Sequence, residues 1–233
     1  MKLLLISNST NAGEEYLRYP LPEIGRFLKG IREIVFVPYA AVTFSYAEYE
    51  RRVAARFAEL GIRVKSVHRA ADPAKTIRQA EAICVGGGNT FALTRKMQEQ
   101  GLMQAIRSRL RAGVPYVGWS AGSNVCCPTI STTNDMPIVE PESFRAIGAV
   151  KFQINPHYLD ANPAGHAGET REQRIREYIR ANPRRWVAGL REGCMLRYEN
   201  GRLELLGKRP VRIFKHGIEP FEVEPGGDLS FLL

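Results

Sequence analysis

The first half of the chain alternates between short, continuously apolar segments and longer amphipathic segments. The apolar segments, which we expect to form strands, are 3–7, 31–39, 62–67, 82–85 and 114–119. The segments in which apolar residues recur at helical spacing are 14–29, where Pro20 and Pro22 delay or break the start of the helix, and 46–60, 73–80, 90–97 and 102–112. Strands that are apolar throughout and separated by helices are typical of a parallel sheet covered on both faces. We therefore expect a doubly wound α/β fold with a mostly parallel sheet.

The second half is less regular and contains segments typical of antiparallel strands. Further strands are expected at 150–154 and 186–190, with two more within 211–223. Residues 195–206 predict a hairpin that turns at Asn200-Gly201, because this dipeptide suits a two-residue turn. Residues 129–142 are rich in Thr, Pro and Asn and predict a functional loop. No linker, repeat or change of composition interrupts the chain, so we expect one domain spanning residues 1–233.

Composition and hydropathy exclude several classes of protein. Of the 233 residues, 44% are hydrophobic and 24% charged, which excludes a disordered chain. No apolar run approaches the roughly 20 residues that a membrane-spanning helix needs, and the apolar N-terminus is too short for a signal peptide. We therefore expect a cytoplasmic protein. The four cysteines, which lack the spacing of a zinc site and are expected to be buried, reduced thiols, are Cys84, Cys126, Cys127 and Cys194.

The chain is basic, with 33 Lys and Arg residues against 24 Asp and Glu residues and a net charge of +9. The basic residues are spread along the chain, with one denser stretch at 171–185. Apolar residues recur in this stretch as on an amphipathic helix, so a solvated helix face explains it better than a nucleic-acid surface. A positive balance also favours a small anionic substrate.

The pentapeptide Gly118-Trp119-Ser120-Ala121-Gly122 follows a predicted strand and precedes a segment able to start a helix. This is the G-x-S-x-G pattern of a nucleophile elbow in its strand–turn–helix context. The glycines allow a sharp turn that lifts the Ser120 hydroxyl clear of the sheet. The free N–H groups at the start of the following helix then face a developing oxyanion. We expect Ser120 to be a nucleophile; the alternative is a tight turn whose serine only caps the helix.

A serine nucleophile needs a base, and the chain has four histidines. His68 ends the predicted strand 62–67 and is expected to be a loop or surface residue, and His216 lies in a predicted turn. His157 instead stands at the end of a predicted strand where the active-site groups of open α/β sheets collect. His166 lies in a glycine-flanked loop just downstream and is the alternative base. We favour His157, because a flexible loop positions a base poorly.

Two carboxylates are candidates to accept a hydrogen bond from the histidine. Asp135 lies in the 129–142 loop, and Glu192 follows the predicted strand 186–190. Asp135 matches the Ser, Asp, His order of α/β-hydrolases, whereas Glu192 lies at a strand end. Because a catalytic triad is defined by geometry, both stay open.

A second glycine cluster, Gly86-Gly87-Gly88-Asn89-Thr90, follows the predicted strand 82–85. It completes neither of the glycine-rich phosphate-binding patterns. A loop of backbone N–H donors for an oxyanion explains it better, with the N–H groups of Gly88 and Ala121 forming the oxyanion hole. Asn89 and Thr90 add polar groups that suit contact with substrate. A turn needed only for packing is the alternative.

Six motifs together resemble the peptidase E family of aspartyl dipeptidases. They are Asn8-Ser9-Thr10, the 86–90 loop, the 118–122 elbow, and the segments 132–139, 153–157 and 168–175. The resemblance extends to about residue 193. It implies a glutamine-amidotransferase-like α/β fold and a serine exopeptidase that needs no metal and no cofactor. It also implies Ser120 as nucleophile and His157 as base, leaves Asp135 and Glu192 open as the acidic partner, and identifies Arg171 as the residue that holds the substrate's aspartate carboxylate.

The expected function is hydrolysis of dipeptides with an N-terminal aspartate through an acyl-enzyme. A guanidinium such as that of Arg171 suits this substrate, because it bonds both carboxylate oxygens at once. The expected partners are small aspartyl peptides, without nucleic acid or membrane, and the expected state is a monomer or homodimer. One alternative is a cyanophycinase-like hydrolase of β-aspartyl bonds. The other is a non-enzymatic basic module that binds nucleic acid or a small acidic ligand.

Overall fold

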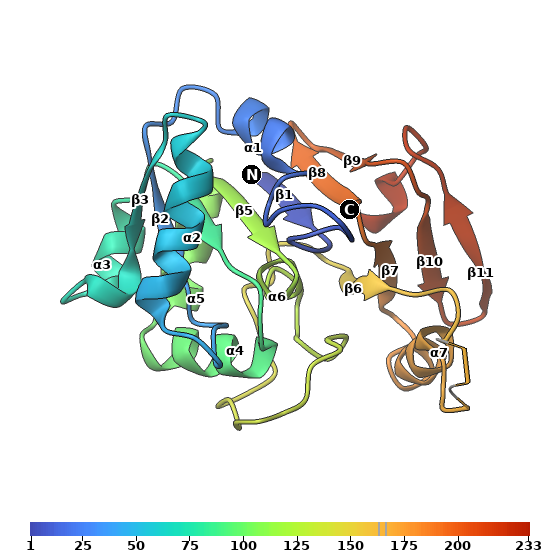
Figure 1. Cartoon of the computed structure of the whole chain (residues 1–233). Helices are drawn as coiled ribbons and strands as arrows, with labels where there is room; N and C mark the ends of the chain where they lie inside the picture. Colours follow the sequence, from blue (N-terminus) through green and yellow to red (C-terminus); the bar gives the residue numbers. More distant parts are fainter. Residues whose placement is uncertain (163, 166) are drawn as a thin grey trace.

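Five parallel strands and an antiparallel hairpin form a seven-stranded sheet in the order β3-β2-β4-β5-β1-β8-β9 (Figure 1). The computed structural model describes residues 1–162, 164–165 and 167–233. The strands of this sheet are β1 (Lys2–Ile6), β2 (Glu33–Val37), β3 (Arg63–Ser66), β4 (Ile83–Val85), β5 (Pro115–Trp119), β8 (Met195–Glu199) and β9 (Arg202–Leu206). The predicted mostly parallel sheet with C-terminal antiparallel strands is confirmed.

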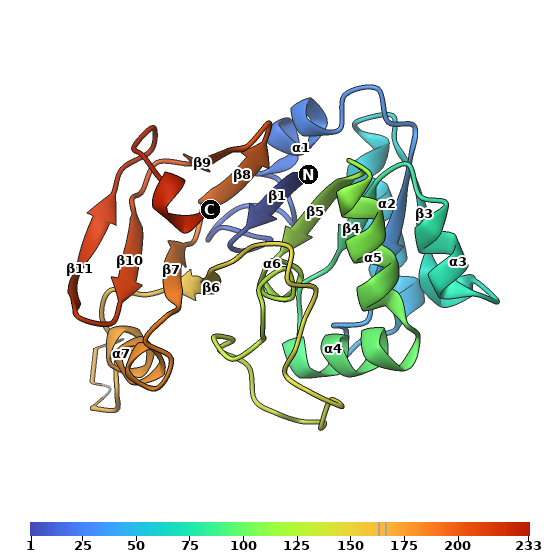
Figure 2. The same cartoon turned by 180° about the vertical axis from the view of Figure 1, so that it is seen from behind.

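Helices cover both faces of this sheet, as Figures 1 and 2 show from opposite sides. The helices that precede β5 are α1 (Leu21–Phe27), α2 (Tyr46–Ala58), η1 (Val67–Arg69), α3 (Pro73–Arg78), α4 (Thr90–Glu99) and α5 (Leu102–Arg111). Alternate side chains of β1 enter separate apolar cores: Leu3 and Leu5 pack on the α5 side, and Leu4 and Ile6 pack on the α2 side. Burial on both faces explains why these strands are apolar throughout.

The first helix begins late in its predicted segment, as the two prolines indicated. Helical spacing extends over 14–29, but α1 begins at Leu21 and residues 16–20 form turns. Pro20 precedes the helix and Pro22 lies in its first turn. Because proline lacks an N–H and fixes φ, it is compatible with the first turn of a helix and not with its interior. The two prolines therefore determine where the helix starts.

A second, four-stranded sheet has the order β11-β10-β7-β6 and packs with the later helices. Its strands are β6 (Gln153–Tyr158), β7 (Trp186–Arg191), β10 (Val211–Lys215) and β11 (Ile218–Val223). The helices of this half of the chain are α6 (Ala121–Asn124), α7 (Arg171–Ala181) and η2 (Ser230–Leu232). We predicted a strand at 150–154, and β6 instead covers 153–158. The hairpin at Asn200-Gly201 is confirmed, with positive φ at both turn residues.

The partition into two sheets was not predicted. The hairpin β8–β9 joins the first sheet beside β1, whereas the strands before and after it, β7 and β10, pair with each other in the second sheet. Hydrophobic periodicity shows that a segment is a strand but does not show which strand it pairs with. Which sheet each strand joins is therefore determined by long-range pairing, which the local pattern does not show.

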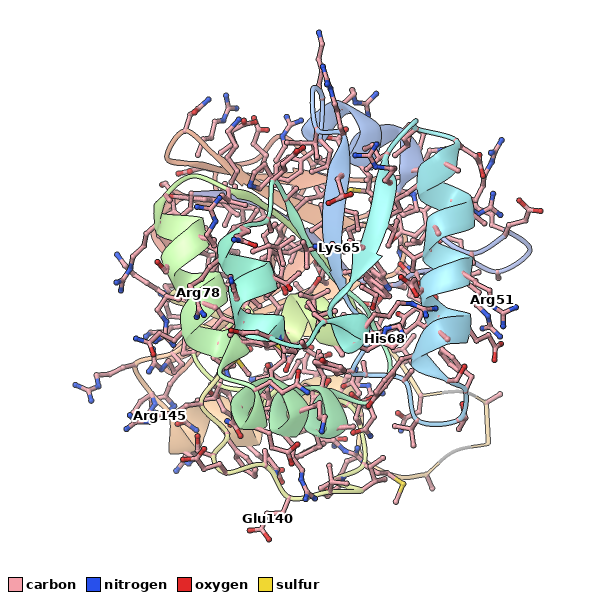
Figure 3. The ribbon with its side chains drawn as sticks, turned by 90° about the vertical axis from the view of Figure 1, so that its left-hand side faces the viewer. Arg51, Lys65, His68, Arg78, Glu140 and Arg145 are labelled. Carbon is pink, nitrogen blue, oxygen red and sulfur yellow. The ribbon has the colours of Figure 1, made fainter. Side chains whose placement is uncertain are left out.

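The surface carries the positive charge in a dispersed form. In Figure 3, Arg51 and Arg145 extend outward at opposite sides of the molecule. The four cysteines are buried and unpaired, as predicted. Among the described residues, no helix combines the length and the apolar character needed to cross a membrane.

Candidate active site

Ser120 occupies a strained turn between β5 and α6. Its φ of +53° is unusual for a residue other than glycine and matches the geometry of a nucleophile elbow. The turn is held by a hydrogen bond from the Ser120 N–H to the carbonyl of Ile6, at 3.0 Å. A Cβ on Gly118 would lie 2.4 Å from the Gly122 carbonyl oxygen, and a Cβ on Gly122 would lie 2.1 Å from the Val85 carbonyl oxygen. Both flanking glycines are therefore required by close backbone contacts.

His157 lies near the end of β6, at an irregularity in its pairing with β7. Its φ is also +53°, and its N–H donates to the Ser7 Oγ at 2.9 Å. The Ser7 Oγ in turn donates to the Leu190 carbonyl at 2.7 Å. This bridge connects the end of β1 in the first sheet to β6 and β7 in the second. As a result, the His157 Nε2 lies 3.0 Å from the Ser120 Oγ.

Glu192 completes a chain of hydrogen bonds that begins at Ser120. It follows β7 directly, and its Oε1 lies 2.7 Å from the His157 Nδ1. The adjacent Gly193 N–H donates to the Asn8 Oδ1 at 2.9 Å, which anchors this turn to the end of β1. An Nδ1 that faces a carboxylate carries the proton in the neutral ring, so Nε2 is left as the acceptor of the Ser120 hydroxyl.

Asp135, the other carboxylate considered, does not bond His157. Its Oδ2 accepts hydrogen bonds from the Thr90 N–H at 2.7 Å, the Thr90 hydroxyl at 2.6 Å and the Thr133 hydroxyl at 3.0 Å. Of the two candidates that the sequence left open, only Glu192 contacts the imidazole. The Ser, Asp, His order of α/β-hydrolases was therefore a misleading guide to the contact.

The other histidines do not meet Ser120 in the part of the chain that the structure describes. The Nδ1 of His68 lies 2.6 Å from the Ser66 Oγ, and His216 lies in the turn between β10 and β11. His166, the alternative base, lies outside the described residues. Of the described histidines, His157 alone is hydrogen-bonded to the serine.

The glycine loop after β4 lies directly against Ser120. A Cβ on Gly87 would lie 2.9 Å from the Ser120 Cβ. Gly88 has a φ of +130°, and a Cβ there would lie 2.3 Å from the Ala40 carbonyl oxygen. Neither the Gly88 N–H nor the Ala121 N–H donates a hydrogen bond to another described residue. Two unpaired backbone donors beside a serine hydroxyl are what an oxyanion hole requires.

A buried tyrosine that sequence reasoning assigned only to the core joins these two parts of the site. The Trp119 Nε1 donates to the Tyr49 hydroxyl at 3.1 Å, and this hydroxyl donates to the Gly87 carbonyl at 2.9 Å. Burial raises the pKa of Tyr49, so its hydroxyl stays a neutral donor. The helical spacing of 46–60 marked Tyr49 as a core residue, but only the tertiary fold places its hydroxyl between the elbow and the glycine loop.

Arg171 is the half-buried first residue of α7. Thr170 and Gln173 form a reciprocal capping box that makes the helix start there. Burial and the neighbouring Arg174 lower the pKa of Arg171, whereas the charge of Asp135 raises it. None of the ion pairs among the described residues includes Arg171, and its predicted contact with substrate stays a prediction.

Asn89 and Thr90 form the start of α4. The Asn89 Oδ1 accepts from the Ala92 N–H at 3.0 Å, and its Nδ2 donates to the Met136 carbonyl at 2.9 Å. The Thr90 hydroxyl donates to Asp135. Both side chains thus hold the 129–142 loop against α4, and their predicted contact with substrate stays a prediction.

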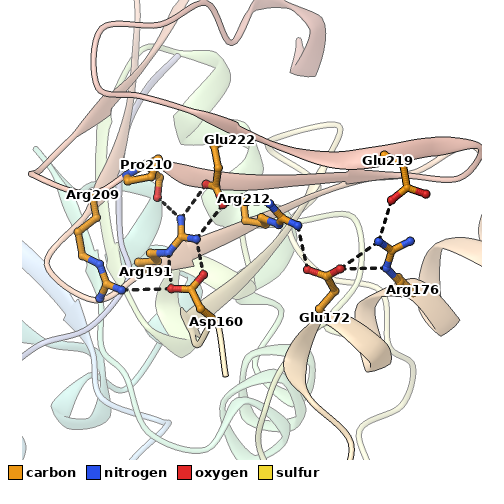
Figure 4. A network of polar contacts seen from close by, with 9 residues as sticks. All are labelled: Asp160, Glu172, Arg176, Arg191, Arg209, Pro210, Arg212, Glu219 and Glu222. Atoms are coloured by element: carbon orange, nitrogen blue, oxygen red, sulfur yellow. Dashed lines mark hydrogen bonds and ion pairs between the residues drawn. The ribbon is translucent and has the colours of Figure 1, made fainter. Parts of the chain in front are cut away.

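A network of ion pairs lies next to Glu192 and Arg171 in the sequence (Figure 4). Buried Arg191, the residue before Glu192, pairs with Asp160 and Glu222 and donates to the Pro210 carbonyl. These hydrogen bonds raise the pKa of Arg191 and lower the pKa of both carboxyls. The network continues through Arg212 to Glu172, the neighbour of Arg171. It therefore ties the turn carrying Glu192 to the start of α7.

Three comparisons identify similar proteins. The model of peptidase family S51 matches residues 3–206. A protein named peptidase E from Nostoc sp. is 48% identical over 233 residues, which is 100% of this chain and 96% of that protein. Peptidase E from Salmonella typhimurium is 48% identical over 226 residues, covering 97% of this chain and 99% of that protein.

A solved structure has the same fold. The crystal structure of a peptidase from an acI-B1 Actinobacterium superposes with a TM-score of 0.71 at 17% identity, covering 99% of this chain and 96% of that one. The match to the family model and the identities over nearly the full length of both relatives agree with the serine elbow found from the sequence. The chain belongs to peptidase family S51 and is a serine-type peptidase.

Proposed function

We propose that this protein is an aspartyl dipeptidase that releases an N-terminal aspartate by acyl transfer to Ser120. The observation that carries the proposal is the hydrogen-bonded chain from Ser120 through His157 to Glu192, with distances of 3.0 and 2.7 Å. The name peptidase E, borne by relatives at 48% identity, supports the same function. Serine, histidine and carboxylate in this order of contacts form the group that activates a hydroxyl for attack on a carbonyl.

The proposed reaction gives each residue of the site a defined role. His157 accepts the Ser120 proton at Nε2 as the Ser120 Oγ attacks the aspartyl carbonyl, and Glu192 stabilises the imidazolium that forms. The N–H groups of Gly88 and Ala121 stabilise the oxyanion. His157 then protonates the leaving amine, and the carbonyl–nitrogen bond breaks. Water, activated by the same histidine, hydrolyses the acyl-enzyme and releases aspartate.

The preference for aspartate is assigned to Arg171. Its guanidinium is half-buried and pairs with no carboxylate among the residues described here, and burial makes an unpaired charge costly. A substrate β-carboxylate removes that cost through two parallel hydrogen bonds. An uncharged side chain leaves the arginine unpaired and is therefore disfavoured.

A panel of leucine dipeptides tests the function. We expect the purified protein to hydrolyse aspartyl-leucine, and to leave asparaginyl-leucine, glutamyl-leucine, β-aspartyl-leucine and N-acetyl-aspartyl-leucine largely uncut, as measured by release of free leucine. Cleavage of the β-linked peptide alone would support the cyanophycinase-like alternative. Absence of turnover with every peptide would overturn the proposal.

Replacing Arg171 by glutamine removes the positive charge and keeps a polar side chain at this position. Loss of two charge-assisted hydrogen bonds lowers kcat/KM for aspartyl-leucine by about 10²- to 10³-fold. Asparaginyl-leucine, which lacks the carboxylate, should be affected little, so the preference for aspartate collapses in steady-state assays of both peptides. The matched control is Arg174→Gln, on an exposed position of the same helix. An equal loss on both peptides would contradict the assignment.

A further inference from the structure

The hydroxyl of Tyr49 contacts three polar groups whose chemistry fixes the direction of its proton. The Trp119 Nε1 and the Tyr16 hydroxyl lie 3.1 and 3.4 Å from it, and both donate to its oxygen. The Gly87 carbonyl, at 2.9 Å, can only accept, so it receives the single proton of Tyr49. A Cβ on Gly86 would lie 2.5 Å from the same oxygen, so only a glycine leaves room for this hydroxyl.

The Gly87 carbonyl and the Gly88 N–H belong to one peptide unit. The Gly87–Gly88 bond is trans, and in a trans peptide the C=O and the N–H point in opposite directions. Whatever holds the carbonyl therefore determines where the N–H points. The carbonyl is held by a buried tyrosine, whereas Gly88 is exposed and its N–H donates to no described residue. Tyr49 thus fixes the direction of a free N–H in the loop that lies against Ser120.

The other hydrogen bonds of the glycine loop hold only its two ends. The Gly86 N–H and the Asn89 N–H donate to carbonyls of the 37–40 segment, at 3.1 and 2.9 Å. Between these ends, the Gly87–Gly88 peptide has the Tyr49 hydroxyl as its one hydrogen-bond partner among the described residues. Because glycine lacks the Cβ that restricts φ and ψ in other residues, this peptide would be free to rotate without that bond.

Tyr49 is itself held firmly and is tied to the elbow. Its side chain is buried, and its ring packs edge-on against Phe36 and Phe44, with centroids 5.0 and 5.3 Å apart. Phe36 in turn stacks on Trp119, the residue before Ser120, at 5.9 Å. One buried hydroxyl therefore sets the glycine loop and the elbow relative to each other. These two segments carry the two N–H groups of the proposed oxyanion hole.

A donor to the carbonyl also strengthens the N–H at the other end of the same peptide. A hydrogen bond at the oxygen draws electron density from the nitrogen, so linked amides polarise one another. In the proposed reaction, negative charge grows on the substrate oxygen only as Ser120 attacks. The Gly88 N–H therefore contributes more in the transition state than in the ground state, and so does the group that directs it.

We propose that Tyr49 is a positioning residue that orients and polarises the Gly87–Gly88 peptide, so that its N–H stabilises the oxyanion. The inference rests on the proposed acyl transfer to Ser120 and adds to it a residue that acts without touching the substrate. It assigns the contribution of Tyr49 to the rate to its hydroxyl and not to its ring.

Tyr49→Phe tests the proposal, because it removes the hydroxyl and keeps the ring in its aromatic contacts. We expect kcat for aspartyl-leucine to fall by about 10- to 100-fold, less than the roughly 10²- to 10³-fold loss from deleting an oxyanion donor. KM should stay within about 2-fold of wild type, because the interaction is made only in the transition state. Rates are referred to the active Ser120 counted by end-point labelling with a fluorophosphonate, so an unfolded fraction does not count as a loss.

The α-aldehyde of aspartic acid gives a second readout, which separates positioning from a loss of stability. The Ser120 Oγ adds to the aldehyde carbon, the electron pair of the C=O π bond moves to the oxygen, and the serine proton moves to the His157 Nε2. The adduct thus carries an oxyanion without breaking a peptide bond. Its inhibition constant should rise in Tyr49→Phe by the factor by which kcat/KM falls. An unchanged inhibition constant would contradict the proposal.

Tyr39→Phe is the matched control. Tyr39 is also a buried tyrosine, but its hydroxyl donates to the Gln100 Oε1 at the end of α4 and not to the glycine loop. We expect this variant to keep kcat within about 2-fold of wild type. A Tyr49→Phe kcat within about 2-fold of wild type, or a loss confined to KM, would overturn the inference alone. If the wild-type protein does not hydrolyse aspartyl-leucine, the proposed function is wrong and the inference is overturned with it.

Discussion

Replacing Ser120 by alanine is expected to lower kcat for aspartyl-leucine on the order of 10⁵-fold, because it removes the only nucleophile in the chain of hydrogen bonds. Alanine keeps the backbone strain at φ +53° almost unchanged, so the fold should persist. The variant should still bind the dipeptide, since Arg171 and the backbone donors remain. Leucine release over long incubations measures the residual rate, and calorimetric titration measures the binding.

The control for this change is Ser131→Ala. Ser131 is an exposed serine in the 129–142 loop, and among the described residues its hydroxyl is hydrogen-bonded to Thr129 alone. We expect kcat within about 2-fold of wild type for this variant, as for most surface substitutions. A Ser120→Ala protein that keeps more than about a hundredth of the wild-type kcat would show that another group attacks the carbonyl, since loss of a nucleophile costs far more than that.

Replacing Glu192 by glutamine is expected to lower kcat about 10³- to 10⁴-fold with little change in KM. A glutamine amide donates to Nδ1 and so favours the imidazole tautomer whose proton is on Nε2, facing Ser120. In this tautomer His157 cannot accept the serine proton. Steady-state kinetics with aspartyl-p-nitroanilide separate kcat from KM, and Glu192→Asp should recover part of the rate because it restores an acceptor.

The form of the loss shows whether Glu192 orients the base or binds substrate. Because orienting the base serves every substrate, Glu192→Gln should lower kcat for aspartyl-leucine and for aspartyl-p-nitroanilide by the same factor. A loss confined to KM would instead assign Glu192 to substrate binding. A rate for Glu192→Gln within about 10-fold of wild type would contradict its role beside His157, because the wrong tautomer costs far more.

Local sequence patterns predicted most elements of the first sheet and the position of Ser120. Apolar runs mark strands buried on both faces, and the elbow motif depends on close contacts that require glycine at 118 and 122. The apolar runs are set by the strands themselves, and the elbow is a short motif that can be recognised in one chain, although the contact that requires Gly122 comes from Val85 on β4. The late start of the helix within 14–29 could also be predicted, because Pro20 and Pro22 are not compatible with a helix interior.

The choice between Asp135 and Glu192 could not be predicted in the same way. Asp135 lies in a long loop and Glu192 follows a strand, and the difference in their contacts depends on how β6 and β7 pair in a second sheet. The bridge through Ser7 and the hydroxyl of Tyr49 also depend on contacts between segments far apart in the chain. A residue's type and its neighbours carry no signal for such contacts.

The partition into two sheets means that the reacting groups are carried by two different sheets. Ser120 is carried by the first sheet, and His157 and Glu192 are carried by the second. The alignment of the three side chains therefore depends on how the two sheets pack against each other. The Ser7 hydroxyl helps to fix this packing, because it accepts from the His157 N–H and donates to the Leu190 carbonyl. A rotation of one sheet against the other by a small angle would separate Oγ from Nε2 while every strand stayed intact. Catalytic activity is thus more sensitive to the relative position of the two sheets than a measurement of secondary structure is.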